Sequence, residues 1–391
     1  MADKQLYKYL PKLRFPEFKD EGEWEVKKLC EIAEKRTERN RGNLPLPVLT
    51  NSATEGVLNQ ANYFEREIVT KDNLTNYYIV DKNDFVYNPR ISSTAPVGPI
   101  SRNKAERGIM SPLYTVFRFN KGDLDFFEQY FRTNYWHQYI KKKANFGARF
   151  DRINIAAEDF FNLPVPFPSN PEQTQIATAL CSLDSLIQSC KEKLEQFKAH
   201  KKGLMQKLFP SLGKAIPAHR FPEFKDCGDW RCVKLKEIIK VNSGRDYKHL
   251  KPGSIPVYGT GGYMTSVNEM LSNVDAVGIG RKGTIDKPQY LCAPFWTVDT
   301  LFFLTSLGEI DILFFYYLTQ LIPWKKYGEQ TGVPSLSKVS IEDLEICIPC
   351  ELEQRKIASV LFSSDELIKK EEDRISFLSS YKQGLLHELL L

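Results

Sequence analysis

The sequence lacks the features that define several large classes of protein. No stretch approaches the ~20 consecutive apolar residues of a membrane-spanning helix, and the first residues contain no apolar core of a signal peptide. The net charge is only +5, from 54 Lys and Arg against 49 Asp and Glu, which excludes a binder that relies on uniform positive charge. These absences predict a cytoplasmic protein in which any nucleic-acid surface is local.

Catalytic signatures are scarce as well. The five histidines form no metal-binding motif, and the glycine-rich run 258–262 does not match the P-loop pattern. Asn88-Pro89-Arg90 partly resembles the Asn-Pro-Pro-aromatic motif of amino-methyltransferases, but the second proline and the aromatic that would stack a flipped base are missing. We therefore predict a chain that is not an enzyme and that binds no cofactor or metal itself.

Eight cysteines are present, and in a cytoplasmic chain they are expected to be reduced thiols. Cys347 and Cys350 have the spacing of a metal or redox pair, yet a tetrahedral zinc site needs four ligands. The nearest other pair, Cys227 and Cys232, lies far away in the sequence. Ordinary buried thiols are the favoured interpretation, and a zinc site is the alternative.

The most informative feature is an internal duplication. Residues 14–32 (RFPEFKDEGEWEVKKLCEI) and 220–238 (RFPEFKDCGDWRCVKLKEI) are identical at 13 of 19 positions. Residues 163–187 match 344–368, and that match continues without a gap to Leu208 and Leu389. The residues between these blocks differ in the two halves. This pattern indicates one frame that holds two different recognition surfaces, because a duplicated active site would be expected to keep its middle segments alike.

The matched ends have the apolar pattern of coiled-coil helices. From Ile176 to Leu208, and again from Ile357 to Leu389, seam positions alternate at spacings of four and three for more than four heptads. We predict two long helices that pair with each other in antiparallel orientation. Lys201 and Lys382 occupy the same seam position in the two helices. Either they set the register of the two helices, or the aliphatic part of each side chain is buried while its amino group reaches water.

The dissimilar middles, 21–165 and 227–345, are rich in aromatic and β-branched residues and are divided by Gly, Pro and Asn. They predict mixed α+β domains. Expected strands are 77–87, 113–119 and 298–304, and an expected helical stretch at 124–143 has its counterpart at 309–327. The predicted domain boundaries are 1–168, 169–210, 211–349 and 350–391, in which the second and fourth parts are the helices.

Three segments in each half carry residues suited to DNA contacts. The first pair is 47–52 and 256–262, which are expected to be loops that follow a strand and are named the hairpin segments. The arginine segments are 87–93 and 278–284, and the basic segments are 136–152 and 324–331. Arg can bind guanine and Asn can bind adenine through two hydrogen bonds, while clustered cations suit phosphates. The alternatives are plain turns, surface salt bridges, and a solvated helix end with a stripe of core residues. The candidate DNA-binding residues are Thr50, Asn51, Asn88, Arg90, Ser92, Lys142, Arg149, Tyr258, Thr260, Arg281, Lys282, Thr284 and Lys325.

Taken together, these features resemble a specificity subunit of a type I restriction-modification system. The resemblance rests on the repeated RFPEFKD openings, the repeated helices, and the segments 277–284 and 331–344 (TGVPSLSKVSIEDL). The corresponding segment of the first half, 147–160 (GARFDRINIAAEDF), matches more loosely.

The resemblance implies an α+β chain with two globular α/β target-recognition domains, separated by two long helices that form an antiparallel coiled coil with pseudo-two-fold symmetry. Each domain would read one half of a bipartite, asymmetric site in double-stranded DNA. The helices would set the gap and dock two modification (methyltransferase) subunits, and ATP-dependent restriction subunits would join for cleavage. S-adenosylmethionine, ATP and Mg would be bound by those partners.

Two other functions stay open at this point. The Asn88-Pro89 pair and scattered acids would suit a methyltransferase or nuclease that acts alone, which methyl transfer or cleavage by the purified chain would reveal. The heptads would suit a coiled-coil scaffold that carries two protein-binding domains. Salt-sensitive binding of a duplex in the presence of modification subunits would argue against such a scaffold.

Overall fold

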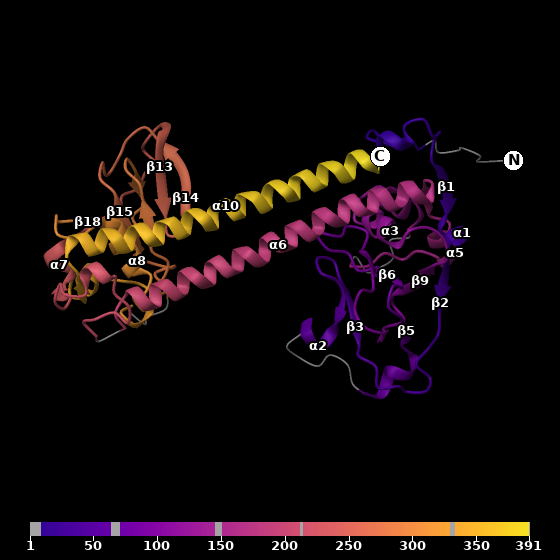
Figure 1. Cartoon of the computed structure of the whole chain (residues 1–391), viewed down its shortest axis with the longest axis horizontal. Helices are drawn as coiled ribbons and strands as arrows, with labels where there is room; N and C mark the ends of the chain where they lie inside the picture. Colours follow the sequence, from indigo (N-terminus) through magenta and orange to yellow (C-terminus); the bar gives the residue numbers. More distant parts are fainter. Residues whose placement is uncertain (1–8, 64–70, 145–150, 212–213, 329–332, 391) are drawn as a thin grey trace. The chain divides into compact units, whose positions relative to one another are not determined.

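The structure is a computed structural model that describes residues 9–63, 71–144, 151–211, 214–328 and 333–390 (Figure 1). The chain divides into two compact units. The first unit contains Met1–Ser189 and Ile375–Leu391, and the second contains Cys190–Arg374. Each unit therefore includes part of each long helix, and the boundaries proposed from the sequence stay a prediction. In the part of the chain that is described, no helix is both long and apolar enough to cross a membrane.

The first unit is built on a four-stranded antiparallel sheet in the order β2-β9-β6-β7. Its strands are β2 (Ala33–Arg36), β9 (Thr115–Phe119), β6 (Phe85–Tyr87) and β7 (Ile100–Arg102). Three strand pairs adjoin it: β1 (Glu25–Lys28) with β10 (Pro164–Phe167), β3 (Leu49–Ser52) with β4 (Gly56–Asn59), and β5 (Tyr78–Val80) with β8 (Gly108–Met110). The short helices are η1 (Pro16–Phe18), α1 (Leu29–Ile32), α2 (Gln60–Tyr63), η2 (Lys71–Asn76), α3 (Leu124–Phe131), α4 (His137–Lys143) and α5 (Ala157–Phe161).

Aromatic packing forms the core of the first unit. The Phe119 ring stacks on Phe127 of α3 with centroids 4.0 Å apart, and it meets Phe85 edge-on. Helix α3 begins where the Asp123 carboxylate accepts hydrogen bonds from the main-chain N–H groups of Asp125 and Phe126. The same core includes Leu386, Leu389 and Leu390, which follow the residues of the second unit in the sequence.

The second unit repeats this plan with other residues. Its four-stranded antiparallel sheet has the order β12-β18-β15-β16, formed by β12 (Ile239–Ser243), β18 (Leu301–Ser306), β15 (Ala276–Gly280) and β16 (Gln289–Leu291). A second sheet joins β14 (Gly262–Val267), β13 (Pro252–Gly259) and β17 (Trp296–Thr297), and β11 (Arg231–Lys234) pairs with β19 (Glu345–Ile348). The short helices are η3 (Pro222–Phe224), α7 (Leu235–Ile238), α8 (Ile312–Thr319), η4 (Trp324–Lys326) and α9 (Lys338–Glu342).

The two long helices are α6 (Asn170–Leu208) and α10 (Glu351–Leu389), each of 39 residues. Within the second unit, Lys193 pairs with Glu371 and Lys201 with Asp365. Later residues of α6 thus meet earlier residues of α10, which confirms the predicted antiparallel pairing. The α+β fold with an internal duplication is also confirmed.

The seam lysines do not extend to water. Lys201 Nζ lies 2.6 Å from Asp365 Oδ1, and Lys382 Nζ lies 2.6 Å from Asp184 Oδ1. Lys382 is only 6% exposed. The interpretation in which these amino groups reach solvent is therefore wrong, because each has an aspartate within the helix pair as its partner.

In each unit, an ion pair joins the repeated segment at its start to one of the long helices. Arg14 binds both carboxylate oxygens of Glu172 at 2.7 Å, and Arg220 binds those of Glu353 at 2.9 and 2.6 Å. Both glutamate side chains are 1% exposed. The repeated Arg-Phe-Pro and Glu-Gln motifs were thus kept alike because they form the same buried ion pair in each unit.

The expected strands and helices are present but shorter than predicted. The stretch 77–87 is two strands, β5 and β6, because the chain turns at Asn83, whose φ is +74°. The predicted strand 113–119 contains β9, the predicted strand 298–304 overlaps β18, which continues to Ser306, and the helical stretch 124–143 divides into α3 and α4.

The prediction for the cysteines is wrong in part. Cys232 and Cys347 lie directly opposite each other on β11 and β19 and form a disulfide. The sequence could not reveal this pair because it depends on the register of two strands 115 residues apart. Most of the others are not buried either: the exposed thiols are Cys30, Cys227, Cys292 and Cys350. The described residues contain no cluster of His, Cys, Asp and Glu placed to hold a metal ion.

Candidate nucleic-acid interface

In the first unit, the hairpin segment and the arginine segment are joined by two asparagines. Asn51 is 2% exposed, and its Nδ2 donates to the carbonyl of Val86 at 2.8 Å. Asn88 Nδ2 donates to the carbonyl of Asn51 at 2.9 Å. Both amides therefore hold the fold together in this conformation and do not present a free edge to a base. Thr50 is half-buried, with its hydroxyl 3.3 Å from that of Tyr114.

The arginine segment of the first unit presents its cation to solvent. Asn88 Oδ1 accepts a hydrogen bond from the main-chain N–H of Arg90 at 3.0 Å, and the Arg90 side chain is exposed. Ser92 is exposed as well, and its hydroxyl accepts from the N–H of Ala95, which shapes the turn that follows. Arg90 also forms a β-bridge with Arg152. The structure thus brings the arginine segment beside the end of the basic segment, which is far away in the sequence.

The basic segment of the first unit combines a buried part and an exposed part. Trp136 is 2% exposed and donates from Nε1 to the carbonyl of Phe131, so it is a core residue and not a stacking surface for bases. Lys142 is exposed at the end of α4. Arg149 lies outside the described residues.

In the second unit, the hairpin segment forms the turn between β13 and β14. Gln289 Nε2 donates to the carbonyls of Gly259 and Thr260, at 2.9 and 3.2 Å, and so fixes the turn from β16. Tyr258 is half-buried, and burial raises its pKa. Tyr263, just past the turn, is 63% exposed. This turn thus offers a rigid backbone with an exposed aromatic ring beside it.

The arginine segment of the second unit is held in the same way as in the first. Its backbone pairs with a residue just after the basic segment, through an isolated β-bridge between Lys282 and Ser335. The side chains of Arg281 and Lys282 are exposed, and the Arg281 guanidinium lies 5.8 Å from the Phe302 ring centroid. Thr284 is half-buried. A Cβ at Gly280 would stand 2.1 Å from the carbonyl oxygen of Thr284, so the bend requires glycine.

Lys325, in the basic segment of the second unit, is exposed but already paired. Its Nζ lies 2.7 Å from Asp286 Oδ2, and this contact lowers the pKa of Asp286. The adjacent Trp324 is 1% exposed and donates from Nε1 to the carbonyl of Thr319, as Trp136 does to Phe131. The tryptophans of both basic segments are therefore core residues, whereas Lys142 and Lys325 face solvent.

Sequence reasoning missed a cationic loop in the second unit. Arg245, Lys248 and Lys251 are exposed after β12. The loop is fastened beside the hairpin segment, because the N–H of Arg245 donates to the carbonyl of Thr297, and β17 pairs with β13. The signal was present as three cations spaced three residues apart, but nothing in the sequence placed them beside residues 256–262.

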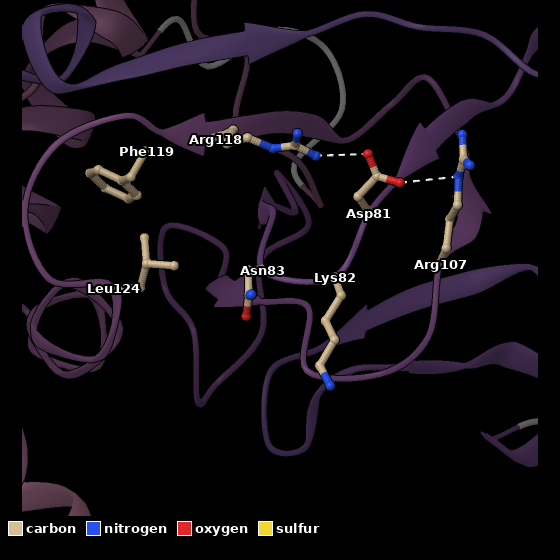
Figure 2. Close-up of a pocket in the computed structure, with 7 residues that line it drawn as sticks. All are labelled: Asp81, Lys82, Asn83, Arg107, Arg118, Phe119 and Leu124. Atoms are coloured by element: carbon tan, nitrogen blue, oxygen red, sulfur yellow. Dashed lines mark hydrogen bonds and ion pairs between the residues drawn. The ribbon is translucent and has the colours of Figure 1, made fainter.

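A hollow lies at the other end of β6 in the first unit, and Figure 2 shows the residues that line it. Its volume is about 570 Å³. Its cations are Lys82, Arg107 and Arg118. Arg118 binds Asp84 at 2.6 Å and Asp81 at 2.8 Å, and Arg107 binds Asp81 at 3.0 Å. Because these carboxylates occupy both guanidinium groups, the hollow is a structural ion-pair cluster and not an anion site.

Comparison with known proteins decides what this arrangement belongs to. The family model of the type I restriction modification DNA specificity domain matches the chain twice, over residues 21–199 and 228–377. The chain belongs to this family. The two matches reproduce the duplication seen in the sequence, and the prediction of a specificity chain that is not an enzyme is confirmed at the level of the family.

Two curated proteins are similar to this chain in sequence. The chain is 25% identical over 272 residues to the type I restriction enzyme MjaVIII specificity subunit of Methanocaldococcus jannaschii, a match that covers 59% of this chain and 62% of the relative. It is 24% identical to the putative type I restriction enzyme MjaX specificity subunit of the same organism, over 94% of this chain and 93% of that one.

The fold matches a crystal structure of the type I restriction-modification system S subunit from M. genitalium with a TM-score of 0.64. The identity is 20%, over 97% of this chain and 99% of the other. A structure described for complex assembly and conformational transition of the type I R-M system matches with a TM-score of 0.54 and 14% identity, over 94% and 97% of the two chains. Both solved chains therefore share the fold of this chain over nearly its whole length.

Proposed function

We propose that this chain is the DNA-recognition subunit of a type I restriction-modification complex, and that each unit reads one half of a bipartite, asymmetric DNA site. The observation that carries the proposal is the contrast between a duplicated frame and unlike loops. In both units the hairpin, arginine and basic segments converge, yet they present different side chains. One frame with two unlike surfaces suits a site with two unlike halves.

The exposed cations support contact with DNA phosphates and bases. Arg90 in the first unit, and Arg281 and Lys282 in the second, stand on bends whose backbones are fixed by hydrogen bonds. A fixed backbone that carries an exposed Arg is suited to the bidentate contact with guanine. The cations of the loop 245–251 add contacts that suit the phosphate backbone.

The partners follow from the family and from the helices. A helix of 39 residues, at ~1.5 Å per residue, is ~58 Å long, which exceeds one DNA turn of ~34–36 Å. We infer that the helices set the gap between the half-sites and dock two modification subunits, and that restriction subunits join the complex. S-adenosylmethionine, ATP and Mg belong to those partners, and the complex works in the cytoplasm, where the DNA is.

The decisive experiment exchanges one recognition surface. Residues 21–165 are replaced by those of a relative, the chain is expressed with its modification subunits, and the methylated sites of the host genome are sequenced. We expect one half-site to change while the other half and the gap stay as they were. A change in both halves, or in neither, would contradict the proposal, and so would methyl transfer by the chain alone.

A further inference from the structure

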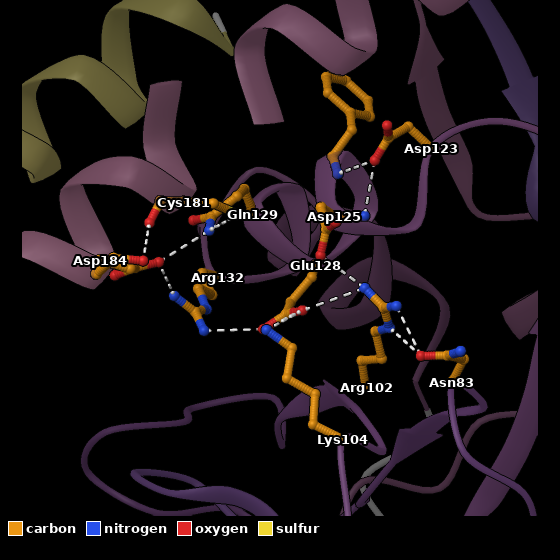
Figure 3. A network of polar contacts seen from close by, with 12 residues as sticks. Asn83, Arg102, Lys104, Asp123, Asp125, Glu128, Gln129, Arg132, Cys181 and Asp184 are labelled. Atoms are coloured by element: carbon orange, nitrogen blue, oxygen red, sulfur yellow. Dashed lines mark hydrogen bonds and ion pairs between the residues drawn. The ribbon is translucent and has the colours of Figure 1, made fainter. Parts of the chain in front are cut away.

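Asp184 of helix α6 lies at one end of a polar network in the first unit, beside Gln129 and Arg132 (Figure 3). Its carboxylate accepts hydrogen bonds from Lys382 of α10 at 2.6 Å, and from Gln129 and Arg132 of α3 at 3.0 and 2.8 Å. Asp184 therefore contacts three elements at once: the long helix that carries it, the other long helix, and a helix of the recognition domain.

Asp365 of helix α10 does the same in the second unit with different partners. It accepts from Lys201 of α6 at 2.6 Å and from the Tyr317 hydroxyl of α8 at 2.7 Å. Lys201 Nζ also lies 5.0 Å from the centroid of the Tyr317 ring. Again one carboxylate joins both long helices to a helix of the recognition domain.

The two aspartates occupy the same place in the repeat, as do Lys201 and Lys382. The donors from the recognition domains are unlike, since Gln129 takes the place of Tyr317. Both units therefore contain a contact that joins the two long helices to a helix of the recognition domain. At this place the donor from the recognition domain is an amide in the first unit and a hydroxyl in the second. A contact that is rebuilt with different residues indicates that the geometry itself is required.

The burial of the lysines makes these contacts costly to break. Lys382 has an 8% exposed side chain and Lys201 a 15% exposed one. Burial lowers the pKa of Lys382, and the bond to Asp184 opposes that shift. A register in which either lysine met an apolar neighbour would bury an unpaired charge, which is strongly unfavourable. Each pair thus admits one register of the two helices.

We propose that Asp184 and Asp365 are positioning residues that lock each recognition domain and both long helices in a single register, and thereby fix the gap that the DNA site must have. This inference rests on the proposed function, because it names the residues by which the two long helices set the gap between the half-sites. It assigns them no contact with DNA.

The test uses the full chain assembled with its modification subunits and a set of duplexes that carry both half-sites at the native gap, one base pair shorter and one base pair longer. The native gap is taken from methylation sequencing of the wild-type complex. Binding is measured by fluorescence anisotropy. In Tyr317→Phe only the hydroxyl is lost, so no buried charge is left unpaired. Asp365→Asn removes the partner of Lys201, and the exchange Lys201→Asp with Asp365→Lys restores an opposite-charge pair.

We expect the wild type to prefer the native gap by at least about tenfold over either neighbour, which corresponds to ~1.4 kcal/mol. Tyr317→Phe and Asp365→Asn should reduce that preference several-fold with little change in affinity for either half-site alone, and the exchange should restore it. The matched control is Glu372→Gln, which removes a half-exposed pair with Lys198 between the same two helices and should leave the preference unchanged.

Three results would overturn the inference. The first is an unchanged gap preference in Tyr317→Phe and Asp365→Asn, even if the melting temperature falls, because the residues would then be structural only. The second is failure of the exchange to restore the preference in a variant that melts like the wild type. The third is an equal loss in Glu372→Gln. If the wild-type complex bound neither half-site, the proposed function would fail instead.

Discussion

The two units attach unlike surfaces to one frame, and they use different chemistry at equivalent points. In the first unit the route from the sheet to the long helices is ionic: Arg102 of β7 binds Asp125 and lies near Glu128, and Arg132 joins Glu128 to Asp184. In the second unit the equivalent route is aromatic. The rings of Tyr290 and Tyr316 meet, as do those of Tyr316 and Tyr317, before the bond to Asp365.

This contrast shows which properties the frame requires. Charges in the first unit and rings in the second unit fill the same position, so the position needs a rigid link and not a particular residue type. The buried Arg–Glu pairs are different, because both units use the same two residues there. The contacts between the repeated starting segments and the long helices are the same in both units. The contacts between the long helices and the recognition domains differ.

The largest expected difference between the units concerns the buried Arg–Glu pairs. Arg220→Ala leaves the Glu353 carboxylate buried without its partner, which should lower the free energy of unfolding by about 3–5 kcal/mol. Arg14→Ala should cost less, because Trp24 still donates to Glu172 at 3.0 Å. Trp230, the counterpart of Trp24, has no hydrogen-bond partner for Nε1 among the described residues. Urea denaturation of both variants would measure the difference, and equal losses would contradict it.

The disulfide should make the second unit alone sensitive to reduction. Cys232 and Cys347 close a loop of 115 residues, and the loss of such a link costs about 2–4 kcal/mol. In the first unit the equivalent strand positions hold Val26 and Pro166. Hydrogen exchange with and without dithiothreitol should show faster exchange in β11 and β19 and no change in β1 and β10.

The matched control for this prediction is the chain with Cys232→Ser and Cys347→Ser. Its exchange should resemble that of the reduced wild type and should not respond to dithiothreitol. Slower exchange in the first unit under oxidising conditions would show that the link acts elsewhere.

The recognition surfaces should differ in which half of the DNA site they affect. Arg281→Ala should weaken binding by about 1–3 kcal/mol if the guanidinium holds a guanine through two hydrogen bonds, and the loss should vanish on duplexes with the second half-site scrambled. Arg90→Ala should act through the first half-site instead. Fluorescence anisotropy on the assembled complex separates the effects of the two variants. An equal loss of affinity on intact and scrambled duplexes would mean that Arg281 contacts phosphate.

The smallest expected effects are opposite responses to pH. Burial alone would raise the pKa of Asp184, but the bond from Lys382 and other donors outweigh it, so the pKa is lowered. Its contribution is present above the ordinary carboxyl pKa of about 3.9 and is lost as the pH falls through the lowered value. Burial and the bond to Asp365 raise the pKa of Tyr317. Its contribution is present below about pH 10 and is lost as the pH rises further.

Acid should therefore loosen the first unit at α3, and alkali should loosen the second unit at α8. Hydrogen exchange of the two helices across the pH range, corrected for intrinsic rates, would show this. The variant Tyr317→Phe should abolish the alkaline response of α8 without altering the acid response of α3.

The sequence predicted the features that repeat along the chain. The duplication, the two long helices, their seam and their antiparallel pairing all follow from spacing, which is visible in one dimension. It did not predict that the seam lysines bind Asp184 and Asp365, because those partners lie more than 160 residues away. The burial of Asn51 was hidden for the same reason: a polar residue after a strand gives no sign of which carbonyls it meets.

The candidate DNA-binding residues show the same limit. The segments that carry them were chosen for composition, and the structure gathers these segments in each unit through backbone pairing such as that between Arg90 and Arg152. Composition could not separate exposed cations from core tryptophans. It also missed Arg245, whose place is set by a hydrogen bond to Thr297. The role of each residue on DNA stays a prediction.

The presence of Leu386, Leu389 and Leu390 in the core of the first unit has a consequence for biosynthesis. The other residues of this core lie between Trp24 and Leu180, so they leave the ribosome long before Leu386 and cannot close their apolar core until the end of α10 has followed. A chain halted between Arg374 and Leu386 would still expose the apolar surface that these leucines cover. We expect such a fragment to be a target for chaperones and proteases.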